Sequence, residues 1–240
     1  MKLSFYKCWS IGLLLLFGTG LANAQFITTW RTTDGSITIP AGGATYSYNI
    51  TWTNQNNAGV GDGSATGQTG AFTINSLEPD SDYRVSITGT FPTLSFAFYN
   101  VGNSNQEIRE INQWGTNVWT SLSTSFSGCL NLIETATDAP VLTGVNSLSQ
   151  MFLNCTSFNG DLNNWTVTSI QNMSSMFFGC TNFNGNITSW NVTGVTDISQ
   201  MFLGTSFNQD ISGWNVSNVE FMSGTFRNCP FNQDISGWNT

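Results

Sequence analysis

Histidine is absent from the 240 residues, and lysine and arginine together number six against fourteen acidic residues. Without histidine the chain lacks the Ser-His and Cys-His nucleophile pairs and most zinc ligand sets. With so few basic residues it also lacks the surface that displaces counterions from nucleic acid. We therefore expect no nucleic-acid partner, no cofactor, no bound metal and no enzymatic activity.

Long apolar runs are missing too. The apolar run at 11–17 follows Lys2 and Lys7 and precedes the small residues at 22–24, a pattern that predicts a secretory signal peptide, residues 1–24, cleaved after Ala24. No stretch reaches the roughly 18 apolar residues that a membrane-spanning helix needs. We expect a protein that is secreted or held at the cell surface, with no transmembrane segment.

What the sequence does contain is a repeat. Its blocks read F-N-G-D-L-N-N-W, F-N-G-N-I-T-S-W, F-N-Q-D-I-S-G-W and again F-N-Q-D-I-S-G-W, and they end at Trp165, Trp190, Trp214 and Trp238. A second motif, M-F-x-x-C, recurs between the blocks. Fixed periods of this length are typical of solenoids, in which one unit cannot bury its own apolar face.

The chain therefore divides into four parts. Residues 1–24 are the predicted signal peptide. Residues 25–93 hold short alternating runs separated by Gly, Pro, Asn and Asp, which predicts a small antiparallel β-sandwich, with a long loop over 54–70. Residues 94–140 are a junction with a degenerate capping coil, and residues 141–240 hold about four repeats that end without a cap, as in a truncated array. The predicted fold class is mixed α/β, a sandwich followed by a leucine-rich-repeat-like parallel β-solenoid.

Each repeat is expected to combine one strand with a short helical return. The alternation F-N-x-D-I predicts a strand, and the three-residue spacing of Val167, Ile170 and Met173 predicts a helical turn. The apolar residues are expected in the core: Cys155, Phe158, Leu162, Phe177, Cys180, Phe183, Ile187, Phe202, Phe207, Ile211, Phe226, Cys229 and Phe231. The polar residues between them are expected on the outward strand face, as a candidate binding surface: Asn159, Asp161, Asn184, Asn186, Asn208, Asp210, Asn232 and Asp234.

The pattern V-x-x-[MI]-S-x-M-F-x-x-C-x-x-F-N-x-D-[LI]-x-x-W-N-V over 141–240 resembles the bacterial surface-protein repeat related to BspA-like leucine-rich repeats. The chain departs from it at Thr205 for Cys, Asn186 for Asp and Thr225 for Met. The resemblance implies a surface-exposed protein with roles in adhesion and protein binding and with no catalytic motif.

Two column positions leave alternatives open. Cys129, Cys155, Cys180 and Cys229 share one place in the repeat, and Thr205 fills it once, which favours a reduced buried column over disulfides between neighbours. The tryptophans either turn inward at a corner or form an exposed ladder on which a glycan could stack.

Function remains a choice between classes. We expect a non-catalytic protein that binds an extracellular protein or glycan, and its oligomeric state is not indicated. A structural spacer that displays another module is the alternative. A glycan-binding protein and a carboxylate-based glycosidase are the less favoured alternatives. The carboxylates Asp161, Asp210 and Asp234 recur with the repeat, and a catalytic pair has no reason to do so.

Overall fold

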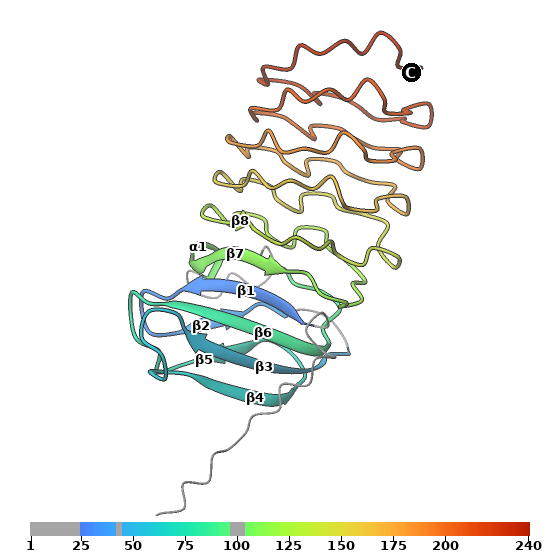
Figure 1. Cartoon of the computed structure of the whole chain (residues 1–240). Helices are drawn as coiled ribbons and strands as arrows, with labels where there is room; N and C mark the ends of the chain where they lie inside the picture. Colours follow the sequence, from blue (N-terminus) through green and yellow to red (C-terminus); the bar gives the residue numbers. More distant parts are fainter. Residues whose placement is uncertain (1–24, 42–44, 97–103) are drawn as a thin grey trace, which may run out of the picture.

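The computed structural model describes residues 25–41, 45–96 and 104–240 (Figure 1). The predicted signal peptide, residues 1–24, lies outside the described residues. The elements in chain order are β1 (Phe26–Arg31), β2 (Ile37–Ile39), β3 (Ser47–Asn54), β4 (Gly63–Gln68), β5 (Phe72–Ile74), β6 (Asp82–Thr90), α1 (Ser104–Glu107), β7 (Ile108–Gln113) and β8 (Ile133–Glu134).

The N-terminal strands form one mixed sheet. Its order is β4-β3-β6-β1-β7-β8, antiparallel except for the parallel pair β7 and β8, and β2 pairs with β5 in a separate two-stranded sheet. Alternation explains the strands, since Tyr48 and Ile50 of β3 are buried while their neighbours face solvent. The rings of Phe26, Phe91 and Trp119 meet on the inner side of this sheet.

The structure does not show the predicted sandwich of residues 25–93. β1 pairs with β6 along one edge and with β7 along the other, so the junction strand β7 extends the same sheet. The stretch 54–70, expected to be a loop, contains the edge strand β4. Its Gly and Ala residues are weak strand formers, and pairing with β3 overrides that preference.

The predicted parallel β-solenoid with helical returns is wrong. After β8, residues 135–240 contain no strand and no helix, and the strand-type pairing between neighbouring repeats there is limited to the isolated parallel bridges Ser147–Asn172, Asn172–Asp197 and Asp197–Phe221. The three-residue spacing arises from consecutive turns, as in Met151 N–H to Leu148 O. Left-handed residues such as Gln150 (φ 58°) and Asn154 (φ 59°) interrupt any helix.

These repeats instead form a stack of turn-rich layers on the sheet (Figure 1). We number them layer 1 (119–140), layer 2 (141–165), layer 3 (166–190), layer 4 (191–214) and layer 5 (215–238). Layer 1 is joined to the sheet through the parallel pairing of β7 with β8. The layers then continue away from the sheet toward the C-terminal end.

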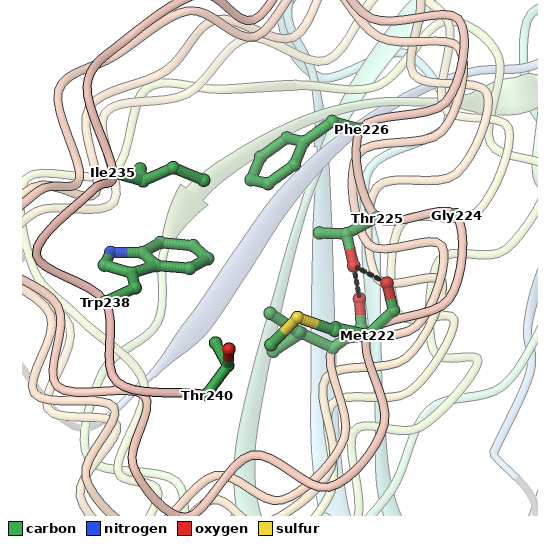
Figure 2. A pocket seen from close by; sticks show the side chains of 8 residues that line it. Met222, Gly224, Thr225, Phe226, Ile235, Trp238 and Thr240 are labelled. Atoms are coloured by element: carbon green, nitrogen blue, oxygen red, sulfur yellow. Dashed lines mark hydrogen bonds between the residues drawn. The ribbon is translucent and has the colours of Figure 1, made fainter.

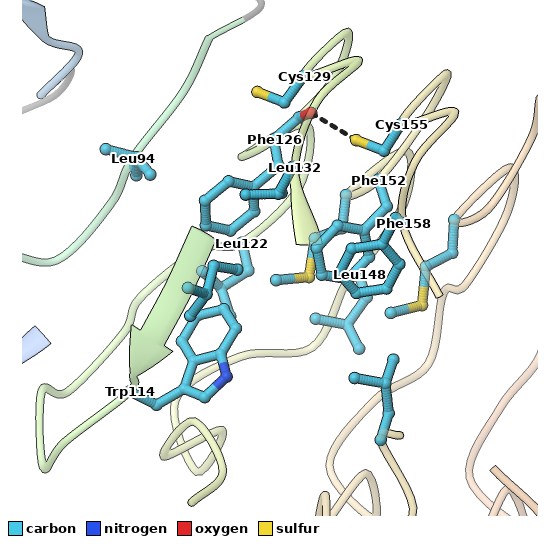
Figure 3. Close-up of a cluster of buried hydrophobic side chains, with 14 of the residues drawn as sticks. Leu94, Trp114, Leu122, Phe126, Cys129, Leu132, Leu148, Phe152, Cys155 and Phe158 are labelled. Atoms are coloured by element: carbon cyan, nitrogen blue, oxygen red, sulfur yellow. Dashed lines mark hydrogen bonds between the residues drawn. The ribbon is translucent and has the colours of Figure 1, made fainter. Parts of the chain in front are cut away.

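Aromatic columns hold the layers together. One column joins Phe126, Phe152, Phe177, Phe202 and Phe226, with ring centroids 5.6, 5.8, 6.0 and 5.7 Å apart. A second column of phenylalanines and the tryptophan column run beside it at 6.0–6.5 Å. Figure 3 shows the start of this core, where the first phenylalanine column passes from layer 1 to layer 2. Burying several rings per layer compensates for the missing regular secondary structure.

Backbone hydrogen bonds between layers run in one direction along the M-F-x-x-C segment. In layer 2 the N–H groups of Leu148, Gln150, Phe152 and Asn154 donate to carbonyls of layer 3, at 2.7–3.0 Å. The equivalent four residues of layer 3 donate to layer 4, and those of layer 4 donate to layer 5. Every second N–H group of the segment thus points to the next layer, and two left-handed residues four positions apart occur in each segment, as at Gln150 and Asn154.

Candidate binding surface

The eight polar residues predicted on the outward face form two columns, which we call the polar strip. Asn159, Asp161, Asn184, Asp210, Asn232 and Asp234 are exposed, and Asn186 and Asn208 are half-buried. The backbone beneath them is irregular rather than a strand, yet the side chains still alternate with buried residues such as Phe158 and Leu162. The strip therefore follows the layers along one side of the stack.

The asparagine column ties one layer to the next. The side-chain oxygen of Asn159 accepts the backbone N–H of Asn184 at 2.7 Å, that of Asn184 accepts Asn208 N–H at 2.8 Å, and that of Asn208 accepts Asn232 N–H at 3.0 Å. Each bond satisfies a backbone donor that no strand ladder satisfies. These four residues thus have a structural role whatever else they do.

The second column caps turns within its own layer. Asp161, Asn186, Asp210 and Asp234 each accept, through the side-chain oxygen, the N–H two residues ahead, at 2.9–3.2 Å. The bond from the Ser212 backbone lowers the pKa of Asp210, and the bond from the Ser236 backbone lowers the pKa of Asp234. Both carboxylates are therefore exposed, ionised and fixed in orientation.

A hollow of about 470 Å³ lies at the sheet end of the polar strip. It is lined by Ala136, Thr137, Asp161, Asn163 and Asn164, where layer 1 meets layer 2. The side-chain amide of Asn164 donates to the Thr137 carbonyl across this boundary at 3.2 Å. The polar part of its lining includes one carboxylate, that of Asp161.

The structure places most of the predicted core residues inside the stack. Those with 0% exposure are Cys155, Phe158, Leu162, Phe177, Cys180, Phe183, Ile187, Phe202, Phe207 and Ile211. Phe226, Cys229 and Phe231 of layer 5 are only partly buried. The inward side of the repeat is therefore continuous from layer 2 to layer 4 and is left partly open at layer 5.

The four cysteines of the column are free thiols. The Cys155 thiol donates to Phe126 O at 2.9 Å, and the Cys180 thiol donates to Phe152 O at 2.7 Å. Burial raises the pKa of Cys129 and of Cys155, so these thiols stay protonated. Within the described chain the reduced column, and not the disulfide alternative, is what the structure contains.

The tryptophan column faces inward. Trp165, Trp190 and Trp214 are 3–4% exposed, and Trp238 of layer 5 is half-buried. The indole N–H of Trp190 donates to Leu162 O of the preceding layer at 2.8 Å. An exposed aromatic ladder for glycan stacking is therefore not present on this side of the molecule.

A buried carboxyl at the joint between sheet and stack was not predicted. Glu134 of β8 accepts the Trp114 indole N–H at 2.7 Å, and its other oxygen is buried without a hydrogen bond near Gly160. Asp138 accepts the backbone N–H groups of Trp114 and Gly115 at 3.0 and 2.7 Å. Burial raises the pKa of Glu134 to about 8. The Trp114 ring then packs edge-on against the Trp165 ring, 5.4 Å away.

Glu107 of α1 is a second buried carboxyl, 4% exposed, and burial raises its pKa to about 7, with a further contribution from Asp34. Neither Glu107 nor Glu134 lines the hollow beside Asp161. Within the described ranges, no three His, Cys, Asp or Glu side chains gather in a group that could hold a metal ion. In the same part of the chain, no helix is long and apolar enough to cross a bilayer.

Comparison with known proteins yields one family. The sequence profile described as "Mycoplasma protein of unknown function, DUF285" matches residues 92–205 and again residues 146–240. The two matches overlap, as expected for a repeat, and together they cover the junction and all five layers. No curated protein and no solved structure matches the chain. The leucine-rich-repeat relationship drawn from the repeat pattern is not confirmed by these matches.

Proposed function

Because the chain belongs to the DUF285 family of bacterial repeat proteins, we propose that it is an exported, non-catalytic surface protein that binds another macromolecule through its polar strip. The observation that carries this proposal is that hydrogen bonds hold the side chains of the polar strip in fixed positions. Its second column places one side-chain oxygen in each of layers 2 to 5, a carboxylate in every layer except layer 3, and each oxygen accepts a backbone N–H group before any partner arrives. A preorganised surface loses less side-chain entropy on binding than a mobile one.

The chemistry of the strip favours a protein partner that presents hydrogen-bond donors. Asp210 and Asp234 are ionised acceptors, and the chain carries a formal net charge of −8. Lys and Arg side chains on a partner complement such a surface and speed association. The buried tryptophans argue for this partner over a stacked glycan. Export rests on the pattern of residues 1–24.

The test removes charge from the strip without breaking its turns. We expect the triple variant Asp161→Asn, Asp210→Asn and Asp234→Asn to lose at least about tenfold in affinity, or ~1.4 kcal/mol, for an Arg-rich probe peptide. Asparagine keeps the oxygen that accepts the N–H two residues ahead, so the melting temperature should stay within about 2 °C of the parent. Titration calorimetry and thermal melts measure the two effects.

The matched control is a second triple variant that changes the net charge by the same amount at positions outside the polar strip. Asp34, Asp62 and Asp197 also accept backbone N–H groups through their carboxylates, at 2.6–3.0 Å, and lie off the strip. The variant Asp34→Asn, Asp62→Asn and Asp197→Asn should keep nearly full affinity. Equal losses in the two triples would mean that overall charge, and not the strip, attracts the probe.

A structural spacer is the second candidate, and the asparagine column favours it. Three of the eight strip residues, Asn159, Asn184 and Asn208, accept a backbone N–H from the next layer, so they stabilise the stack itself. If the protein is a spacer, the variant with Asp161→Asn, Asp210→Asn and Asp234→Asn should bind partner proteins with the same affinity as the parent. Asn184→Ala should lower the melting temperature.

A further inference from the structure

The asparagine column of the polar strip contains the two Asn-Gly pairs of the sequence, Asn159-Gly160 in layer 2 and Asn184-Gly185 in layer 3. At the same position of layer 4, Asn208 is followed by Gln209. The backbone nitrogen of the residue after an asparagine can attack the asparagine side-chain carbonyl, and glycine hinders this attack least because it has no side chain. Layers 2 and 3 therefore carry a reactive pair where layer 4 carries an unreactive one.

In both pairs the side-chain carbonyl is held by a backbone donor of the next layer. Asn159 Oδ1 accepts the Asn184 N–H at 2.7 Å, and Asn184 Oδ1 accepts the Asn208 N–H at 2.8 Å. A fixed donor at this oxygen stabilises the negative charge that develops when a nucleophile adds to the carbonyl carbon, as the donors of an oxyanion hole do. The bonds that join the layers thus also activate the two side-chain amides.

The other atoms that the reaction needs are not engaged elsewhere. Within residues 104–240, the backbone N–H groups of Gly160 and Gly185 have no hydrogen-bond acceptor. Over the same residues, the side-chain Nδ2 of Asn159 and that of Asn184 have no acceptor either, and both side chains are exposed to solvent. The nucleophile and the leaving group of each pair are therefore free, while the carbonyl oxygen is held in place.

We propose that Asn159 and Asn184 are sites of spontaneous deamidation in the folded protein. The glycine nitrogen forms a bond to Cγ of the preceding asparagine, and Nδ2 leaves as ammonia with the proton of the glycine N–H. Water then opens the five-membered succinimide ring to give either aspartate or isoaspartate. Water is the only co-reactant.

Conversion to aspartate raises the negative charge of the polar strip and keeps the layers joined. A carboxylate oxygen accepts the N–H of the next layer as the amide oxygen does. Layer 3, which has Asn186 where the other layers have an aspartate, thereby gains a strip carboxylate at position 184. Isoaspartate instead adds one carbon to the backbone where the layers are closest, since even a Cβ on Gly185 would clash with the Gly160 carbonyl oxygen.

The experiment incubates the folded 240-residue protein at pH 7 and at pH 9 and measures the masses of its proteolytic peptides over time. We expect Asn159 and Asn184 to convert at least about tenfold faster than Asn208. Asn208 is the matched control, because its Oδ1 accepts the Asn232 N–H at 3.0 Å in the same way. Both conversions should be faster at pH 9, because the glycine nitrogen attacks after losing its proton.

Asn232 of layer 5 is a poorer control, because its layer is less closely packed. Phe226, Ile235 and Trp238 are only half-buried and surround a hollow of about 410 Å³ (Figure 2). A comparison with Asn208, inside the closely packed layer 4, prevents local opening from being mistaken for intrinsic reactivity.

Two results would overturn the proposal. One is that Asn159 and Asn184 stay unmodified in the folded protein while synthetic peptides of residues 155–163 and 180–188 react under the same conditions, because the stack would then protect both pairs. The other is an equal rate at Asn159, Asn184 and Asn208. Since mass is measured, neither result depends on whether the strip binds a partner.

A variant with the product residues tests whether the stack accepts them. Asn159→Asp combined with Asn184→Asp should melt within about 2 °C of the parent, because both ladder bonds remain. A larger fall in melting temperature would contradict the claim that aspartate fits the ladder.

Discussion

At the scale of single residues, Glu134 is the side chain whose chemistry differs most from its usual state. Its carboxyl is buried between the Trp114 indole and Gly160, and the space exists because Gly160 has no Cβ. A Cβ there would lie 2.9 Å from the free carboxyl oxygen. The protonated form is therefore the one that the folded protein favours at neutral pH.

Stability should depend on pH through this group. The pKa of Glu134 is about 8 in the folded protein against the ordinary 4.5. Its protonated form thus contributes stability that is fully present below about pH 4.5 and lost as the pH rises to about 8. We expect Glu134→Gln to flatten this fall in thermal melts from pH 5 to 9. Between pH 5 and pH 9 the free energy of unfolding of the variant should rise by at least ~1 kcal/mol relative to that of the parent, which corresponds to a few degrees in melting temperature.

The exposed acid Glu220 provides the control for Glu134. Glu220→Gln removes the same charge and should leave the slope of melting temperature against pH as it is in the parent. Glu107 keeps its own contribution in both variants, since its pKa is also raised. A parent and a Glu134→Gln variant with identical slopes would contradict the role given to burial.

Sequence reasoning could not find Glu134, and the reason is spatial. Glu134 lies 20 residues from Trp114 and outside the part of the chain where the repeat is recognisable. Burial of a carboxyl depends on what covers it, and no local pattern shows that cover. The polar strip was easier to predict from the sequence, because its residues recur at fixed positions in the repeat. What repetition could not show is that the asparagines bond between layers.

At the scale of one element, a layer depends on close backbone contact with its neighbour. A Cβ on Gly185 of layer 3 would lie 1.9 Å from the carbonyl oxygen of Gly160 in layer 2. We expect Gly185→Ala to destabilise the protein by about 1–3 kcal/mol, because the two layers must move apart. Chemical denaturation measures the loss.

Gly213 gives the comparison for Gly185, since a Cβ there meets nothing within 4 Å. Gly213→Ala should change stability by less than about 0.5 kcal/mol. Equal effects of the two substitutions would mean that the layers are spaced more loosely than the Gly160–Gly185 contact indicates.

The layer also shows where sequence-based prediction of the fold fails. Alternating Phe and Ile indicates the buried side of the repeat, and Phe183 and Ile187 are fully buried. The backbone is another matter. Apolar residues three apart fit a helical turn and a series of i to i+3 turns equally well. The left-handed Gln150, Ser175 and Gln200 decide between them, and neither Gln nor Ser is a residue type that signals this conformation.

At the scale of the whole molecule, stability should decline with distance from the sheet. The N–H groups of Phe152, Phe177 and Phe202 donate to the next layer at nearly equal distances, 3.0, 3.1 and 3.0 Å. Differences in their exchange rates would therefore report how often each layer opens. Layers contact only their neighbours, so we expect the order Phe202 fastest, then Phe177, then Phe152, by amide exchange under native conditions. Equal rates at all three amides would show that sheet and stack unfold as one unit.

The one-way hydrogen bonding of the M-F-x-x-C segments has an electrostatic consequence. Every second peptide group of these segments points its N–H end away from the sheet in layers 2, 3 and 4. Each peptide group is a dipole of about 3.5 D, and aligned dipoles add as they do along a helix. The M-F-x-x-C segment of each layer therefore has its positive side away from the sheet and its negative side toward the sheet. In a protein with a formal net charge of −8, these segments add a local positive potential along one edge of the stack.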